Sequence, residues 1–157
     1  MRNKMASSNG CSFLAEITAD YGDHVQSFMM SCEADSRGNI TFSVVSPETI
    51  FGVSGTIDET GGKLNFDEAM LGFPLLADGQ LSPVSAPWVL VRALRSGYIG
   101  ASGNDGALTR TTIHDSYAED ALQLEVWFDQ NLVPVQGEII YKGRRILTVT
   151  VSNFIFL

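Results

Sequence analysis

The chain alternates between apolar and polar side chains over most of its length. In the clearest stretch, Leu122, Leu124, Val126 and Phe128 occupy every second position. Successive side chains of a strand point to opposite faces, so a period of two predicts a sheet with one face in a core and one in solvent. The pattern therefore predicts a mainly β protein.

Turn-forming residues divide this pattern into about ten short antiparallel strands, which is typical of a barrel, a half-barrel or a sandwich. A proline after Ser46 ends one strand, because proline cannot donate to a ladder, and a short strand is expected over 69–73. The final strand, 145–157, has apolar residues on both faces, with Val149 and Ile155 on one and Phe154 on the other. This predicts that its end is covered on both sides.

One helix is expected to interrupt the strands, from Ala86 to Ser96. Ser85 is a suitable N-cap, and Pro87 lies in the first turn, where its missing N–H is not needed. Gly97 is a typical helix terminator.

The expected helix has an unusually wide apolar face. At 100° per residue its aliphatic side chains cover more than half of the circumference, and only Trp88, Arg92 and Arg95 share the remaining stripe. A surface helix has a narrower apolar face. We therefore expect a curved sheet wrapped around one central helix, with the arginine stripe near an opening.

The two cysteines, Cys11 and Cys32, fall in the first two expected strands, which form a hairpin. If Tyr21 and Gly22 make the turn, the cysteines lie directly opposite each other and a disulfide can form. If Gly22 and Asp23 make it, they are diagonal neighbours. A disulfide Cys11–Cys32 and two reduced, half-buried thiols both fit the sequence, and the disulfide would imply an extracytoplasmic location.

Length and charge restrict the remaining possibilities. The 157 residues suit a single domain, 1–157, and the net charge of −8 disfavours nucleic acid as a partner. No apolar run is long enough for a transmembrane segment. Residues 1–10 lack the apolar region of a signal peptide and are expected to be a disordered N-terminal remnant, with no signal or anchor segment in this chain.

The order of parts resembles the LolA-like superfamily, the lipoprotein-carrier fold, in its Gram-positive bacterial lipoprotein type. The resemblance lies in the middle block, from Pro74-Leu75-Leu76-Ala77-Asp78-Gly79 to Ala86-Pro87-Trp88, and in the closing stretch from Val133-Pro134-Val135 to Ser152-Asn153-Phe154. It implies a half-barrel with a helix lid over an apolar cavity for acyl chains. It also implies a location outside the cytoplasm, membrane-associated or at the cell surface. A lipobox is not found at Cys11.

On this basis we expect a non-enzymatic domain that binds an acyl lipid or a lipoprotein. The alternative is a structural domain with a filled core that binds an envelope protein partner. No cofactor and no metal site are expected, because two histidines and two cysteines form no ligand cluster. Enzymatic use of the acidic stretch 115–120 is a remoter hypothesis. The candidate ligand-binding residues are Met70, Phe73, Leu75, Leu76, Trp88, Leu90, Arg92, Leu94, Arg95 and Trp127.

Overall fold

The structure is a computed structural model that describes residues 1–58 and 74–157. Its nine described strands form one antiparallel sheet in the order β4-β3-β2-β1-β9-β8-β7-β6-β5, which confirms the mainly β prediction. The strand expected over 69–73 lies outside the described residues. The strands are β1 (Gly10–Asp20), β2 (Val25–Asp35), β3 (Ile40–Ser46), β4 (Ser54–Ile57), β5 (Tyr98–Asp105), β6 (Leu108–His114), β7 (Gln123–Phe128), β8 (Pro134–Tyr141) and β9 (Arg144–Phe156).

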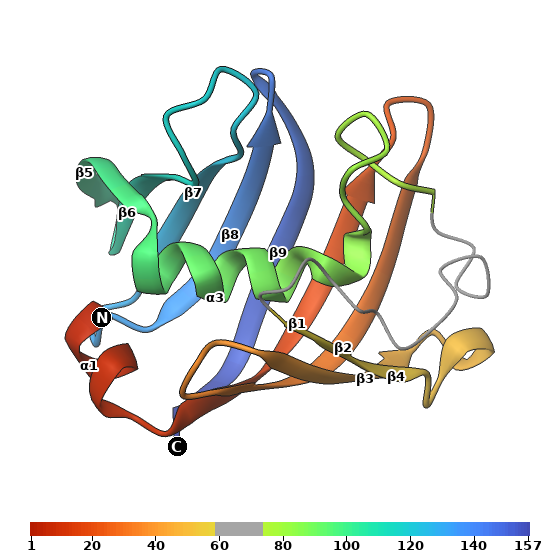
Figure 1. Cartoon of the computed structure of the whole chain (residues 1–157), viewed down its shortest axis with the longest axis horizontal. Coiled ribbons are helices and arrows are strands. Elements are labelled where there is room, and N and C mark those ends of the chain that lie inside the picture. Colours follow the sequence, from red (N-terminus) through yellow and green to blue (C-terminus); the bar gives the residue numbers. More distant parts are fainter. Residues whose placement is uncertain (59–73) are drawn as a thin grey trace.

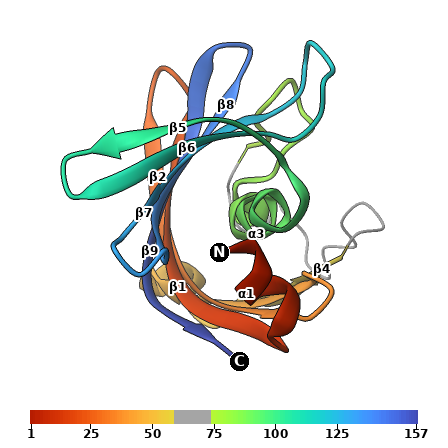
Figure 2. The ribbon, with the colours of Figure 1, turned by 90° about the vertical axis from the view of Figure 1, so that its left-hand side faces the viewer.

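The sheet curves around helix α3 (Ala86–Ser96), as Figures 1 and 2 show. Irregularities in register accompany this curvature in the pairs β1–β9, β2–β3, β5–β6, β7–β8 and β8–β9. A β-bulge bends the strand that carries it and increases its twist. The arrangement confirms the predicted curved sheet around a central helix.

The core lies between the concave face of the sheet and α3. In β1, Phe13, Ala15 and Ile17 are buried, and the residues between them are more exposed. Beneath the helix the packing is close, since a Cβ added at Gly137 of β8 would lie 3.2 Å from Leu90 Cδ1. Leu90 therefore fills the space between the middle of α3 and the sheet.

The N-terminal residues form a short helix, α1 (Arg2–Ser7), where we expected a disordered remnant. Met5 of this helix is buried in the core, and Arg2 binds backbone carbonyls at the end of α3. The contact between α1 and α3 could not be predicted from the sequence, because the segment is mostly polar and has no repeating apolar pattern. In the described part of the chain no helix is long and apolar enough to cross a membrane.

The first hairpin settles the geometry of the two cysteines. Tyr21 N–H bonds the carbonyl of His24, so Gly22 and Asp23 make the turn. Cys11 lies opposite Ala34 and is a diagonal neighbour of Cys32, and both thiols are buried and free. The directly opposed pairing that would favour a disulfide is therefore not the register adopted.

The end of β9 differs from the two-faced strand that we predicted. Its pairing with β1 is irregular, and Asn153 has a positive φ of 52°. Asparagine tolerates this left-handed conformation, and the extra residue shifts the alternation by one. Phe154 consequently stacks on Phe13 of the inner face, whereas Ile155 is exposed. Only one face of this end is covered.

Strand β5 continues to Asp105, which pairs with Leu108, so the β5–β6 hairpin turns at Gly106 and Ala107. All eight residues of β5 are exposed, and the strand forms one edge of the sheet.

Candidate functional site

Helix α3 begins and ends where its flanking residues predict. A 3-10 turn (Pro83–Ser85) runs directly into it, so Ser85 has helical backbone angles and makes no side-chain cap, contrary to our expectation. At the other end the N–H of Gly97 bonds the carbonyl of Ala93. A Cβ at Gly97 would lie 2.4 Å from Ile113 Cγ2, so only glycine fits between the helix and β6.

An apolar pocket lies beside the C-terminal end of α3, between the helix and strands β5 to β7. Its volume is about 310 Å³. Ile99 is 56% exposed and stands opposite Ile113 on the neighbouring strand, so part of the lining faces solvent. The pocket is lined by Met1, Arg2, Leu94, Ile99, Ser102, Thr109, Thr111, Ile113, Phe128 and Leu132.

Arg2 closes one side of this apolar pocket. Its Nε donates to the carbonyl of Leu94 at 3.1 Å, and its Nη2 contacts the carbonyls of Ala93 and Gly97. A helix leaves its last carbonyls without intrahelical partners and carries partial negative charge at that end. The guanidinium of α1 thus caps the helix that the sheet surrounds.

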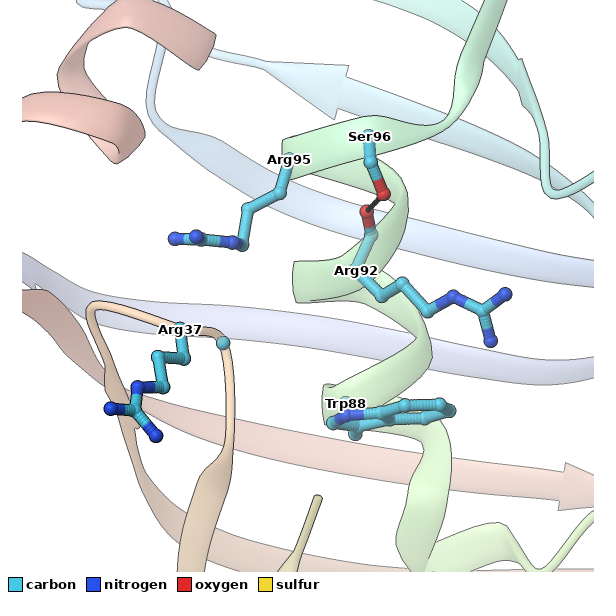
Figure 3. Close-up of a pocket in the computed structure, with 6 residues that line it drawn as sticks. Arg37, Trp88, Arg92, Arg95 and Ser96 are labelled. Carbon is cyan, nitrogen blue, oxygen red and sulfur yellow. Dashed lines mark hydrogen bonds between the residues drawn. The ribbon is translucent and has the colours of Figure 1, made fainter. Parts of the chain in front are cut away.

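An arginine pocket of about 440 Å³ lies along the polar stripe of α3 and is shown in Figure 3. Trp88, Arg92 and Arg95 come from the helix, as the stripe predicted. Across the pocket, the turn between β2 and β3 contributes Arg37 and Gly38. We define the arginine pocket by these residues and Ser96.

The arginines of this pocket differ in their partners. Arg92 Nη2 lies 3.3 Å from Asp115 Oδ1, and its guanidinium carbon is 5.2 Å from the centre of the Trp88 ring. Among the residues that the structure describes, no carboxylate lies within ion-pair distance of Arg37 or Arg95. Within the described ranges, Arg37 and Arg95 therefore bring positive charge to the pocket without a carboxylate partner, in a chain whose net charge is −8.

The charge of Arg95 also reaches the buried thiol of Cys11. Burial raises the pKa of Cys11 to about 11, and the positive charge of Arg95 opposes this shift without cancelling it. Burial likewise raises the pKa of Cys32 to about 12, with a further contribution from Cys11. Both side chains are thus neutral thiols at physiological pH and act as small apolar residues of the core.

The structure separates the predicted ligand-binding residues into several groups. Trp88, Arg92 and Arg95 line the arginine pocket, and Leu94 lines the apolar pocket. Leu76 and Leu90 are buried in the core, whereas Leu75 is exposed. Met70 and Phe73 lie outside the described residues.

Trp127 was expected to line a cavity but lies on the convex face of the sheet. Its indole N–H donates to Asp105 at 2.8 Å, and its ring lies 5.3 Å from the guanidinium of Arg110. The alternation along β7 places Leu124, Val126 and Phe128 on the inner face, and hence Trp127 on the outer face. This signal was present in the sequence.

Beside Trp127, a buried carboxylate stabilises the convex face. Glu125 accepts hydrogen bonds from Arg110 Nε at 2.9 Å, from Thr112 at 2.9 Å and from Gln123 at 3.1 Å. Burial acts to raise the pKa of Glu125, but these hydrogen bonds and the charge of Arg110 outweigh it and hold the pKa below its usual value of 4.5. The network is a structural ion pair that sequence reasoning missed.

Sequence reasoning also missed most of the apolar pocket and one side of the arginine pocket. Ile113 and Phe128 could have been assigned to the inner face from their alternation, but Arg37 reaches the pocket from the turn between β2 and β3, which is far from α3 in the sequence. Within the described ranges 1–58 and 74–157, no group of three or more His, Cys, Asp or Glu side chains is arranged to hold a metal ion.

No protein-family model and no curated protein matches the sequence. Solved structures that resemble the chain include a LolA superfamily protein from Nitrosomonas europaea, with 8% identity and a TM-score of 0.44 over 99% of this chain and 91% of that one. A DUF1329 family protein from Desulfovibrio piger has 7% identity and a TM-score of 0.42, over 99% and 88%. MucB has 10% identity and a TM-score of 0.45, over 98% of this chain and 56% of its own. Membership of the LolA-like superfamily, like its Gram-positive lipoprotein type, stays a prediction from the sequence.

Proposed function

We propose that this protein binds an acyl-bearing ligand, a lipid or a lipoprotein, outside the cytoplasm, and that it does so without catalysing a reaction. The observation that carries the proposal is the apolar pocket between the end of α3 and strands β5 to β7. The extracytoplasmic location rests on the resemblance of the sequence to lipoprotein carriers.

The composition of the apolar pocket suits a hydrocarbon chain. Leu94, Ile113 and Phe128 form its base, while Ile99 and Leu132 line it from positions half open to solvent. A volume of about 310 Å³ is at the lower end of the range for small-molecule sites. Burial of about eight methylene groups would contribute about 6 kcal/mol before the cost of association.

The proposed site is not where the resemblance to carriers would put it. A cavity beneath the middle of the helix lid is disfavoured, because Leu90 packs against Gly137 there. The ligand would instead enter at the end of α3, next to the exposed edge strand β5. Exposed apolar side chains at this edge support an opening toward solvent.

The test is the binding of a fluorescent fatty acid, cis-parinaric acid, and its displacement by palmitate. The wild-type protein should bind the probe saturably, and Ile99→Asp should weaken binding at least tenfold, because it places a charge in the pocket lining. Ile155→Asp is the matched control, since Ile155 is 58% exposed on β9 against 56% for Ile99 and lines no part of the pocket. Absence of saturable binding to the wild-type protein would refute the proposal.

A second candidate function is that of a structural domain that binds an envelope protein partner. Edge strand β5 favours it, since all eight of its residues are exposed and an unpaired edge can accept a strand from another chain. This function predicts no binding of the acyl probe. It also predicts that a proline at Ser102 of β5 abolishes capture of the partner, without altering the unfolding of the free protein by more than about 1 kcal/mol.

A further inference from the structure

We propose that the arginine pocket receives a phosphate group. The inference rests on the proposed function in so far as that phosphate belongs to an acyl-bearing ligand. A free phosphate compound would present the same chemistry to the pocket, and the experiment below separates the two sources.

The first argument is the charge that the pocket collects. Arg37, Arg92 and Arg95 are three of only ten lysine and arginine residues in the chain. Among the described residues, the ion pair of Arg92 with Asp115 offsets one of the three charges, and two remain without a carboxylate partner. A phosphate monoester carries about −1.5 to −2 at neutral pH, whereas a carboxylate carries only about −1. A dianion therefore matches the pocket better.

The second argument is that helix electrostatics do not account for the whole group. Arg95 lies in the last turn of α3, where the helix dipole favours positive charge in any case, whereas Arg92 lies about one turn earlier. Arg37 gains nothing from this dipole, because it belongs to the turn between β2 and β3. A third cation brought to the same pocket by a separate element costs energy by repulsion unless an anion is bound.

The third argument is the shape of the turn that faces α3. Gly38 has a positive φ of 90°, and a Cβ there would lie 3.0 Å from Cδ of Arg95 and 3.2 Å from its Nε. The bare backbone lets the stem of Arg95 lie against the turn beside Arg37. Figure 3 shows Arg95 extending from the helix to the side on which Arg37 lies. Planar guanidinium groups bind phosphate oxygens through paired hydrogen bonds.

The fourth argument is the position of the pocket relative to the apolar one. Leu94 lines the apolar pocket and Arg95, the next residue, lines the arginine pocket. Both pockets thus border the last turn of α3. One amphiphile with a phosphate next to its acyl chains has the chemistry to occupy both.

The experiment uses Trp88 as the reporter, because it lines the arginine pocket. In the full chain with Trp127→Phe, Trp88 is the only tryptophan. Its fluorescence is followed during titration with inorganic pyrophosphate, dioctanoyl phosphatidic acid, dioctanoylglycerol and octanoate. Arg37→Gln and Arg95→Gln are compared with Arg145→Gln, which removes the same charge from an exposed arginine on β9 outside the pocket.

We expect phosphatidic acid to bind at least tenfold more tightly than dioctanoylglycerol and octanoate. Each of the two pocket variants should lose about tenfold in affinity and Arg145→Gln less than twofold, since hydrogen bonds to charged groups are the strong ones. Binding of phosphatidic acid should weaken with added salt. Equal affinity for phosphatidic acid and dioctanoylglycerol, or equal losses in all three variants, would overturn the inference.

The same titrations separate this inference from the proposed function. In one outcome, the wild-type protein binds pyrophosphate, Arg37→Gln does not, and acyl chains add nothing to the affinity. This result supports the phosphate site, assigns it to a free phosphate compound and refutes the acyl proposal. Acyl ligands that bind equally with and without phosphate uphold the proposed function and refute the phosphate site.

Discussion

The contact between Arg2 and the end of α3 is the feature whose removal is most informative. The side chain crosses from α1 to three backbone carbonyls of the helix terminus and also lines the apolar pocket. We expect Arg2→Ala to destabilise the protein and to detach α1 from the end of the half-barrel.

The magnitude follows from the groups that lose their partner. A hydrogen bond from a charged donor, as from Nε to the carbonyl of Leu94, contributes about 1.5–3 kcal/mol, and a cation at a helix C-terminus adds about 0.3–1 kcal/mol. Ordering of the arginine side chain offsets about 1–2 kcal/mol. The net loss should be about 1.5 kcal/mol, which lowers the Tm of a chain of this size by about 5 °C.

The assay is urea unfolding followed by circular dichroism, with Arg2→Ala, Arg2→Lys and Lys4→Ala compared. Arg2→Lys keeps the charge but not the planar donors, so it should lose about half as much. Lys4 lies on the exposed side of the same helix, 6.0 Å from the ring of Phe156, and its removal should cost about 0.5 kcal/mol. If Arg2→Ala loses no more stability than Lys4→Ala, the helix-capping argument is wrong.

Three further perturbations test other parts of the fold. Gly97→Ala should lower the free energy of unfolding by about 2 kcal/mol because its Cβ has no room, whereas Gly103→Ala, with nothing within 4 Å, should change it by less than about 0.5 kcal/mol. Glu125→Gln should destabilise by about 2 kcal/mol at pH 7. Because the folded-state pKa of Glu125 is lowered, its stabilisation is present above pH 4.5 and is lost as the pH falls through the folded-state value, so wild type and variant should converge in acid denaturation. Cys11 and Cys32 should react with a thiol reagent at pH 8 only after unfolding, giving two free thiols by mass spectrometry, and a disulfide-linked product would contradict the register.

The sequence predicts the helix and the inner face of the sheet well, because both depend on neighbouring residues. The bounds of α3, from Ala86 to Ser96, follow from Pro87 and Gly97, whose effects are local. The stripe with Trp88 follows from the period of the helix alone and does line a pocket. The ligand that a pocket binds depends on residues from several elements, so a local sequence pattern does not predict it.

The errors arise where a single residue changes the alternation or where distant segments meet. One left-handed residue, Asn153, moves Phe154 to the inner face, and a strict period of two does not anticipate it. Arg37 joins the stripe of α3 only because the sheet curves far enough to bring the turn between β2 and β3 back to the helix. Trp127 lies on the outer face because it alternates with Val126 and Phe128 of the inner face.

Because β1 and β9 lie at opposite ends of the sequence, we expect the centre of the sheet to form last. Strands β1 to β4 and β5 to β9 are each built from neighbouring hairpins, and among the described strands the two groups pair through β1 and β9, which are the first and last in sequence. Such long-range pairing slows folding. Until β9 has been synthesised, the inner edge of β1 has no partner and can pair with another chain. The two halves of the sheet are therefore held together at its centre, by β9. A chain that stopped before Arg144 would lack β9, and its two groups of strands would not form one continuous sheet.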